Sequence, residues 1–246
     1  MPRRVTRIPV VLATVLALSP GVGAAAKPGV AHPAGLAPAR SSTGSACPRW
    51  SLGGDFRVAP KERNPNPDRC GGRRVWSFLH GGRSPATYAL LAQFIPDAFG
   101  VRGLEQWQGP HQSGGPTDKL PAVGINATGS TQVVRGITWP ARSVRVHPWI
   151  NDHVVVGWRS PITGDVHFAV VATDLDPGCG DGVEVAVRVG TRDVASDRVL
   201  NGGTGRLRGT VEAFQGRFVY FVVGNGGRND FGCDSTGLSV RLRPVS

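Results

Sequence analysis

The last hundred residues alternate apolar and polar side chains, and this alternation constrains the fold more than any other feature of the sequence. In one segment, Val183, Val185, Val187 and Val189 are separated by single residues that are mostly polar. This spacing places one set of side chains on the core face of a β-strand and the other set toward solvent. Gly, Asn and Asp, which favour turns, lie between such segments. The sequence therefore predicts an all-β fold, a two-sheet antiparallel β-sandwich.

Thirteen segments have the length and composition of strands. They are 55–58, 74–80, 87–95, 104–108, 132–137, 143–147, 153–159, 165–173, 182–189, 192–199, 207–214, 217–223 and 238–243. The segment 217–223 is apolar on both faces, which predicts a central strand covered on both sides. Helix signals are scarce.

The first 26 residues have the pattern of a secretory signal peptide. Arg3, Arg4 and Arg7 precede an apolar run, 8–18, and three alanines end at Ala26, the expected cleavage point. The run has 11 residues, about half the roughly 20 that a membrane-spanning helix needs. We therefore expect a secreted, extracellular protein without membrane insertion.

The predicted organisation is a signal peptide over 1–26, a disordered linker over 27–46 and one sandwich domain over 47–246. The linker is mainly Ala, Pro, Gly, Ser and Thr, a composition that cannot fill a core. The remaining 200 residues suffice for one sandwich domain.

The net charge is strongly positive. The chain carries +11, and removal of the three signal-peptide arginines leaves +8, of which Lys27 and Arg40 in the linker account for two. This charge favours anionic partners such as acidic polysaccharide. The arginines are spread over many predicted strands, however, so solvated strand faces explain them more simply. Export argues against a nucleic-acid partner.

Four cysteines, an even number in an exported chain, predict two disulfides. They allow three pairings, of which we expect Cys47 with Cys70 and Cys179 with Cys233. The reason for the second pair is the order of the predicted strands. If strands from residue 143 onward alternate in direction, every second loop falls at the same end of the sandwich, and Cys179 and Cys233 both lie in that set.

We call this end of the sandwich the acidic end. Its loops are 148–152, 174–181, 200–206 and 224–237. Six of the 17 acidic residues lie in them, namely Asp152, Asp174, Asp176, Asp181, Asp230 and Asp234.

A calcium site is the one cofactor site that the acidic end suggests. Asp174, Asp176 and Asp181 lie close together in a glycine-rich loop, with Asp230 and Asp234 as the expected distant ligands. Calcium takes about six to eight oxygen ligands, which carboxylates and loop carbonyls supply. The alternative is that these Asp and Gly residues only form the turn, with the carboxylates accepting hydrogen bonds from backbone amides.

The candidate ligand-binding residues lie at the same end. They are Trp149, Asn151, Asp152, Asn201 and Asn225. An exposed Trp offers a flat apolar face to a sugar ring, while Asn and Asp bind its hydroxyl groups. Packing in the core is the alternative for every Trp of this chain.

Enzyme chemistry has little support in the sequence, and no catalytic residue is predicted. There is no Gly-x-Ser-x-Gly or His-Glu-x-x-His motif. A glycosidase needs two carboxylates across the scissile bond, and only Glu105, beside Leu104 and Trp107, has an unusual setting for its type. The histidines His147, His153 and His167 do not converge on the predicted strands, so we expect no histidine metal site.

Several short stretches resemble a jelly-roll β-sandwich module that recurs in secreted and surface bacterial proteins and is similar to carbohydrate-binding modules. They are 50–56, 64–67, 75–78, 121–126, 146–148, 154–161, 180–185 and 234–238. The resemblance implies a jelly-roll fold and glycan binding. The chain departs from the usual setting of such modules because no catalytic domain accompanies it, and its four cysteines are additional to the pattern.

These observations predict a monomeric, non-catalytic protein that binds an extracellular or cell-wall glycan at the acidic end, with structural calcium. Two alternatives remain. One is a basic structural or adhesive surface module that binds anionic polymers through its strand faces. The other is a glycan-acting hydrolase that uses Glu105.

Overall fold

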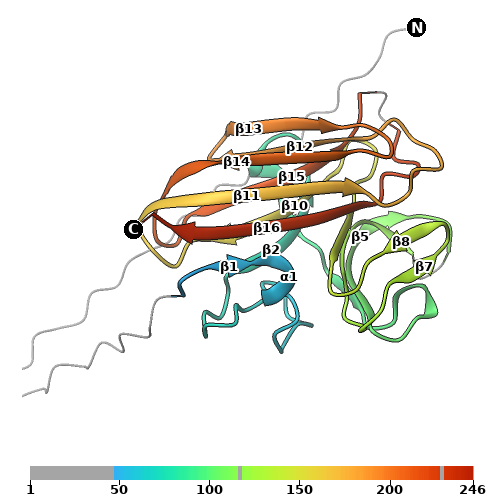
Figure 1. Ribbon diagram of the computed structural model, residues 1–246, viewed down its shortest axis with the longest axis horizontal. Coiled ribbons are helices and arrows are strands. Elements are labelled where there is room, and N and C mark those ends of the chain that lie inside the picture. Colours follow the sequence, from blue (N-terminus) through green and yellow to red (C-terminus); the bar gives the residue numbers. More distant parts are fainter. Residues whose placement is uncertain (1–46, 116–117, 228–229, 246) are drawn as a thin grey trace, which may run out of the picture. The chain divides into compact units, whose positions relative to one another are not determined.

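Two antiparallel sheets packed face to face form the structure, as the alternation predicts (Figure 1). The computed structural model describes residues 47–115, 118–227 and 230–245, all within one compact unit, Thr43–Ser246. The predicted signal peptide and linker lie outside the described residues.

Sheet A, the larger one, has eight strands. In spatial order they are β14 (Thr204–Ala213), β11 (Gly164–Asp174), β16 (Thr236–Pro244), β9 (Val144–His147), β6 (Lys119–Asn126), β5 (Leu104–Gln112) and β4 (Gln93–Ile95), with β1 (Trp50–Ser51) paired to β16.

Sheet B has six strands. Their spatial order is β13 (Arg192–Val199), β12 (Val183–Val189), β15 (Phe218–Asn225), β10 (His153–Arg159), β2 (Trp76–Gly81) and β3 (Ala89–Leu90). The predicted central strand is β15, which lies between β12 and β10.

The connections are of the jelly-roll type, because the chain passes repeatedly from one sheet to the other. From β9 to β16, every connection crosses between the sheets except the β12–β13 hairpin. The short elements are a separate ribbon of β7 (Gln132–Val134) and β8 (Ile137–Trp139), the helix α1 (Leu52–Asp55), and the 3₁₀ turns η1 (Pro85–Thr87) and η2 (Ala98–Gly100). None of the helices in the described part of the chain is long and apolar enough to cross a membrane.

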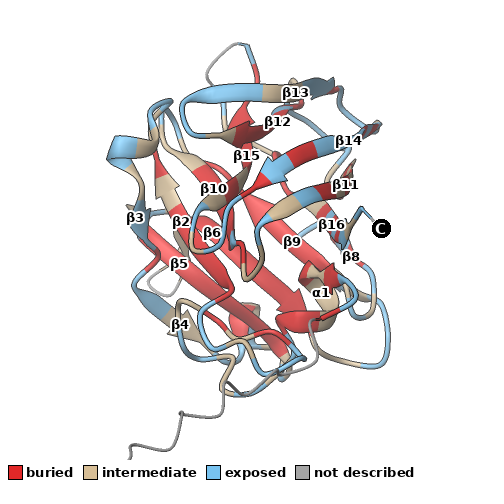
Figure 2. Cartoon of the chain, turned by 90° about the vertical axis from the view of Figure 1, so that its left-hand side faces the viewer, coloured by how far each residue is buried: buried red, intermediate tan, exposed pale blue. Residues whose placement is uncertain are grey.

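The core lies between the sheets and contains the predicted inward-facing residues. Val183, Val185 and Val187 are buried there together with Trp50, Trp76 and Trp158. The rings of Trp50 and Trp158 contact each other, with centroids 5.0 Å apart. Figure 2 shows buried residues along the middle strands of both sheets. Burial of apolar side chains, about 1.5–3 kcal/mol for each large one, is therefore the main stabilising contribution.

Several sequence-based element assignments were wrong. Residues 132–137 do not form one strand, because the chain turns at Arg135 and Gly136 (φ 51° and 84°) between β7 and β8. Residues 55–58 do not form a strand, because the Asp55 carboxylate accepts hydrogen bonds from the Ser51 amide and the Trp76 indole and holds the short helix α1 in place. Residues 87–95 split into the end of η1 and the separate strands β3 and β4.

Another error is that β6 was missed. Pro121 and Gly124 make this segment unlike a typical strand, although it pairs with β5 and β9. Gly124 is required there because a Cβ at this position would lie 2.7 Å from the ring of Trp139.

Both predicted disulfides, Cys47–Cys70 and Cys179–Cys233, are present. Two disulfides are typical of a protein from an oxidising, extracellular compartment.

Candidate functional site

The four predicted loops meet at the acidic end. The Leu175 amide donates to the Ser235 carbonyl (2.8 Å), and the Asn201 side chain donates to the Pro177 carbonyl (3.1 Å). The Cys179–Cys233 disulfide joins two of the loops covalently. The loop 148–152 joins this group, because Asn151 lines the same small cavity as Asn225.

Trp149 is packed against other aromatic rings rather than presented as a free platform. Its ring is stacked with that of His111 (centroids 5.5 Å apart) and lies 4.0 Å from that of Phe231. The side chain is half-buried. Trp149 thus joins β5 to the loop that precedes β16, which is a structural contribution that the sequence did not indicate.

Asp152 is bonded to two histidines. Its carboxylate accepts hydrogen bonds from His80 Nδ1 (2.9 Å) and His111 Nε2 (2.8 Å). Burial acts to raise the pKa of Asp152, but the hydrogen bonds and charges of His80 and His111 bring it below the ordinary value. Asp152 therefore fixes the position of the loop beside Trp149.

Most of the predicted calcium ligands are engaged in the turns themselves. The Asp174 carboxylate accepts hydrogen bonds from the Asp176 and Gly202 amides. Asp230 accepts from the Gly232 amide. Asp181 lies 3.6 Å from the Arg198 guanidinium. Within the described ranges, no three His, Cys, Asp or Glu side chains are placed to hold a metal ion.

Asp234 differs from the other acidic residues of this end. Its side chain is 2% exposed, and both carboxylate oxygens are buried without a hydrogen-bond partner in the described part of the chain. Burial, together with the charges of Asp181, Asp230 and Asp174, raises its pKa to about 8. Among the described residues, neither a hydrogen-bond donor nor a cationic side chain contacts this carboxyl group.

A hollow opens on the outer face of sheet B, next to the acidic end. It consists of two adjoining cavities of about 380 and 220 Å³ that share Arg83, His153 and Glu184. The smaller cavity is also lined by Asn151 and Asn225, two of the predicted ligand-binding residues. We call this the sheet B hollow. Its combined size falls in the range of small-molecule sites, about 300–1,000 Å³.

The strand register explains why the hollow exists. Side chains alternate between the two faces, so Glu184 and Ala186 of β12 and His153 of β10 point outward while their neighbours fill the core. The floor is made of small residues, and a Cβ at Gly224 would lie 3.1 Å from the His153 ring. Glycine at this position allows the imidazole to lie against the sheet.

The charges that line the hollow are balanced. The three cations are Arg83, Arg188 and Arg198, and the three acids are Glu184, Asp193 and Asp197. Arg188 binds the Asp193 carboxylate through two nitrogens (2.6 and 3.0 Å). In contrast, neither the Arg83 guanidinium nor the Glu184 carboxylate has a hydrogen-bond or ion-pair partner among the described residues.

His153 is the third side chain of the hollow that has no hydrogen-bond partner among the described residues. Its Nδ1 atom is buried and has no hydrogen-bond partner within the described ranges. Burial lowers the pKa of His153, and the charges of Arg83 and Arg188 lower it further. The ring is therefore neutral at pH 7, with one nitrogen that donates and one that accepts.

A row of aromatic side chains continues from the hollow along the same face. Arg188 donates to the Tyr88 hydroxyl (2.7 Å), and the Tyr88 ring contacts Tyr220 edge-on (5.1 Å). Phe218 stacks on Tyr220 with centroids 5.3 Å apart. These rings are half-buried, so each keeps part of its surface in solvent.

The residues considered for catalysis do not form a catalytic group. Glu105 pairs with Lys61 at 2.5 Å and is mostly buried. His147 is buried, its pKa lowered to about 3 by burial and by the Arg145 charge, and its Nδ1 bonds to the Pro148 carbonyl. His167 bonds to Thr210.

No protein-family model and no curated protein sequence matches the chain. Solved structures that resemble it include a carbohydrate-binding module, CBM51-2, solved with INT domains of Clostridium perfringens ZmpB in complex with GlcNAc (17% identity, TM-score 0.33). That match covers 44% of this chain and 22% of the other. A CBM51 of Clostridium perfringens GH95 in complex with methyl-galactose has 14% identity and TM-score 0.35, over 56% of this chain and 91% of the other.

A third structure is the Podospora anserina GH26-CBM35 β-(1,4)-mannanase, with 16% identity and TM-score 0.31 over 50% of this chain and 25% of the other. The chain thus spans about a quarter or less of the length of two of these three structures. The fold assignment rests on the two sheets and their connections, described above.

Sequence reasoning missed Arg83 and Glu184 as site residues. Glu184 alternates with buried valines, a pattern that is typical of an ordinary solvent-facing residue. Arg83 lies in the loop that follows β2. This loop comes close to β12 only because of the order of strands in sheet B, and no local sequence pattern reveals that order. The proximity of Asn151 to Asn225 was indicated by the alternation of loops.

Proposed function

We propose that the protein is a non-catalytic extracellular module that binds a neutral glycan chain in the sheet B hollow. The observation that carries the proposal is that Arg83, His153 and Glu184 converge there with no partners among the described residues. Of their polar atoms only His153 Nδ1 is buried, whereas Arg83 and Glu184 are exposed and hydrated. Both charged groups are therefore available to form hydrogen bonds with a ligand that supplies donors and acceptors.

Adjacent sugar hydroxyls are such a ligand, because each hydroxyl donates one hydrogen bond and accepts others. The Glu184 carboxylate accepts, the Arg83 guanidinium donates, and the neutral His153 ring does both. The balanced charge of the hollow favours a neutral glycan over an anion or a cation. The half-buried rings of Tyr88, Tyr220 and Phe218 pack against one another, and their exposed parts would give apolar contact to the next sugar of a longer chain.

A glycan array, followed by affinity measurements on the best ligand, tests the proposal. Glu184→Gln keeps the shape of the side chain and removes its charge, and we expect about tenfold weaker binding. The matched control is Glu212→Gln, an exposed glutamate on β14 of the other sheet, which should bind as wild type. Equal affinity of all three proteins would contradict the assignment of the hollow.

We also propose a structural calcium ion at the acidic end. The buried carboxylate of Asp234, without a hydrogen-bond partner and surrounded by acidic residues, supports this. Asp234 and Asp230 would be the protein carboxylates nearest to the ion. The other oxygens would come from loop carbonyls and water, because in the described part of the chain no three side chains converge.

A further inference from the structure

We propose that the outer face of sheet A carries a second binding site, independent of the sheet B hollow, for an acidic polysaccharide. The site is a groove of about 770 Å³ between β1 and the strands β16, β11 and β14. Five arginines line it, namely Arg49, Arg69, Arg208, Arg241 and Arg243, and its described lining contains no acidic residue. We call it the arginine groove.

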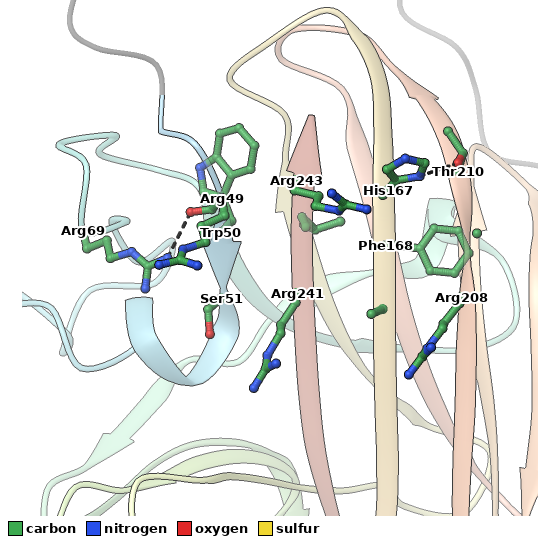
Figure 3. A pocket seen from close by; sticks show the side chains of 13 residues that line it. Arg49, Trp50, Ser51, Arg69, His167, Phe168, Arg208, Thr210, Arg241 and Arg243 are labelled. Atoms are coloured by element: carbon green, nitrogen blue, oxygen red, sulfur yellow. Dashed lines mark hydrogen bonds between the residues drawn. The ribbon is translucent and has the colours of Figure 1, made fainter. Parts of the chain in front are cut away.

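The arginines come from three separate parts of the fold. Arg49 and Arg69 lie on one side of the groove, Arg241 and Arg243 project from β16, and Arg208 projects from β14 on the far side (Figure 3). A second cavity of about 530 Å³ shares Arg69 and Arg241 with the groove and adds Arg57 and Arg142. It also has no acidic residue in its described lining. The positive surface therefore extends beyond the groove.

Strand register sets the spacing of these charges. Arg208 and Arg241 are both paired with Ala169 of β11, so they lie in one row across the sheet, about 10 Å apart at the backbone. Arg243 lies two residues beyond Arg241 on the same face, about 7 Å along the strand. The result is a lattice of cations that matches a chain with regularly repeated negative charges.

Except for Arg69, the guanidinium groups of the groove have no anionic partner among the described residues. Arg208, Arg241 and Arg243 are exposed and have no carboxylate within 4.0 Å among the described residues. Arg69 is held by the Arg49 carbonyl (3.1 Å) and lies 3.6 Å from the buried Asp55 carboxylate. An arginine fork binds a carboxylate or sulfate through two parallel hydrogen bonds.

The lining favours a polysaccharide over the other polyanions. Single-stranded nucleic acids bind through exposed aromatic rings on which bases stack, but the groove's aromatic residues Trp50 and Phe168 are 1% and 4% exposed. Amphipathic membrane-binding surfaces place exposed apolar side chains beside the cations, whereas Trp50, Phe168 and Leu242, which line this groove, are buried. The polar groups of this groove are instead hydroxyl and imidazole groups, with His167 bonded to Thr210 (2.7 Å).

The groove has a defined end. Beyond the row of His167 and Thr210, the next outward-facing pair on β11 and β14 is Asp165 and Glu212. Like charges repel, so an acidic chain would not extend past this pair. The acidic polysaccharide would instead run from the row of Arg243 toward Arg69 and Arg142.

The test is the binding of the full mature protein to two immobilised acidic polysaccharides, heparin and polygalacturonate, with dextran as the neutral reference. Heparin presents mainly sulfates and polygalacturonate presents carboxylates, so the two arms separate the anion types. We expect binding to at least one that weakens as NaCl is raised from about 50 to 500 mM, because salt screens exposed charges.

Two double variants with the same loss of charge identify the location. Arg241→Gln/Arg243→Gln should weaken binding about tenfold. The control Arg192→Gln/Arg217→Gln, at one exposed position on β13 and one in the turn just before β15, should change it less than about twofold. All variants are exposed surface substitutions, and thermal unfolding checks that they are folded.

Three results would overturn the proposal: equal weakening by both double variants, no binding to either acidic polysaccharide, or tighter binding to duplex DNA than to both. Glu184→Gln should leave polysaccharide binding to the groove unchanged. Conversely, Arg241→Gln/Arg243→Gln should not change the affinity for a neutral glycan bound in the sheet B hollow. The two proposals can therefore fail separately.

Discussion

Replacement of Asp234 by Asn tests the electrostatics of the acidic end. The ordinary pKa of this carboxyl group is 3.8, and burial and the neighbouring carboxylates raise it to about 8 in the folded protein. Between these two values the folded state holds a proton that the unfolded state has released. The stability contributed by Asp234 is therefore fully present below about pH 4 and is lost as the pH rises toward 8.

The structure sets the size of the effect. One pKa unit corresponds to about 1.4 kcal/mol, so a rise from 3.8 to about 8 amounts to at most about 6 kcal/mol in the free energy of unfolding. Movement of the loop and entry of water would reduce this. We expect Asp234→Asn to be about 2–4 kcal/mol more stable than wild type at pH 8 in chelator, and within about 1 kcal/mol of it at pH 4.5.

The assay is urea unfolding of both proteins between pH 4.5 and 8, with Asp165→Asn on the exposed face of β11 as the control. The comparison between variant and wild type cancels the other titrating groups, such as His147. A stability difference that does not change with pH would refute the reasoning. With millimolar calcium the order should reverse, because an ion bound to ionised Asp234 stabilises only the wild type.

Two further predictions concern the packing of the acidic end. Trp149→Ala should lower the free energy of unfolding by about 1–3 kcal/mol, because it removes the contacts with His111 and Phe231; urea unfolding at the wild-type stability would contradict this structural contribution. Replacement of Cys179 and Cys233 by Ser should cost about 4 kcal/mol, since the bridge closes a loop with a sequence separation of 54. An unchanged thermal midpoint of the double variant would contradict it.

The strands with strict alternation were predictable because period two is a local property. The segment around Val183–Val189 needed no knowledge of the rest of the chain. The strand β6 was missed because Gly124 is needed for the packing of Trp139, which belongs to β8 in a separate ribbon and not to a strand paired with β6. A local pattern cannot show that a glycine is needed for contact with another element.

The same contrast between local patterns and contacts of distant segments applies to the candidate sites. The pairing of Cys179 with Cys233 followed from loop alternation, and the same alternation placed Asn151 and Asn225 at one end. Binding of anionic polymers by basic strand faces was one of the alternatives drawn from the sequence, but the position of the arginine groove was not predicted, although Arg241 and Arg243 have the spacing of one strand face. What was missing is that β11 lies between β14 and β16, which turns scattered arginines into one surface.

The most direct test of glycan binding by the sheet B hollow is a map of amide chemical-shift changes as the best array glycan is added to the labelled protein. The largest changes should lie at Arg83, His153, Glu184 and the neighbouring residues of β12 and β15. Changes centred instead on the loop around Trp149, or on the outer face of sheet A, would contradict the proposed site.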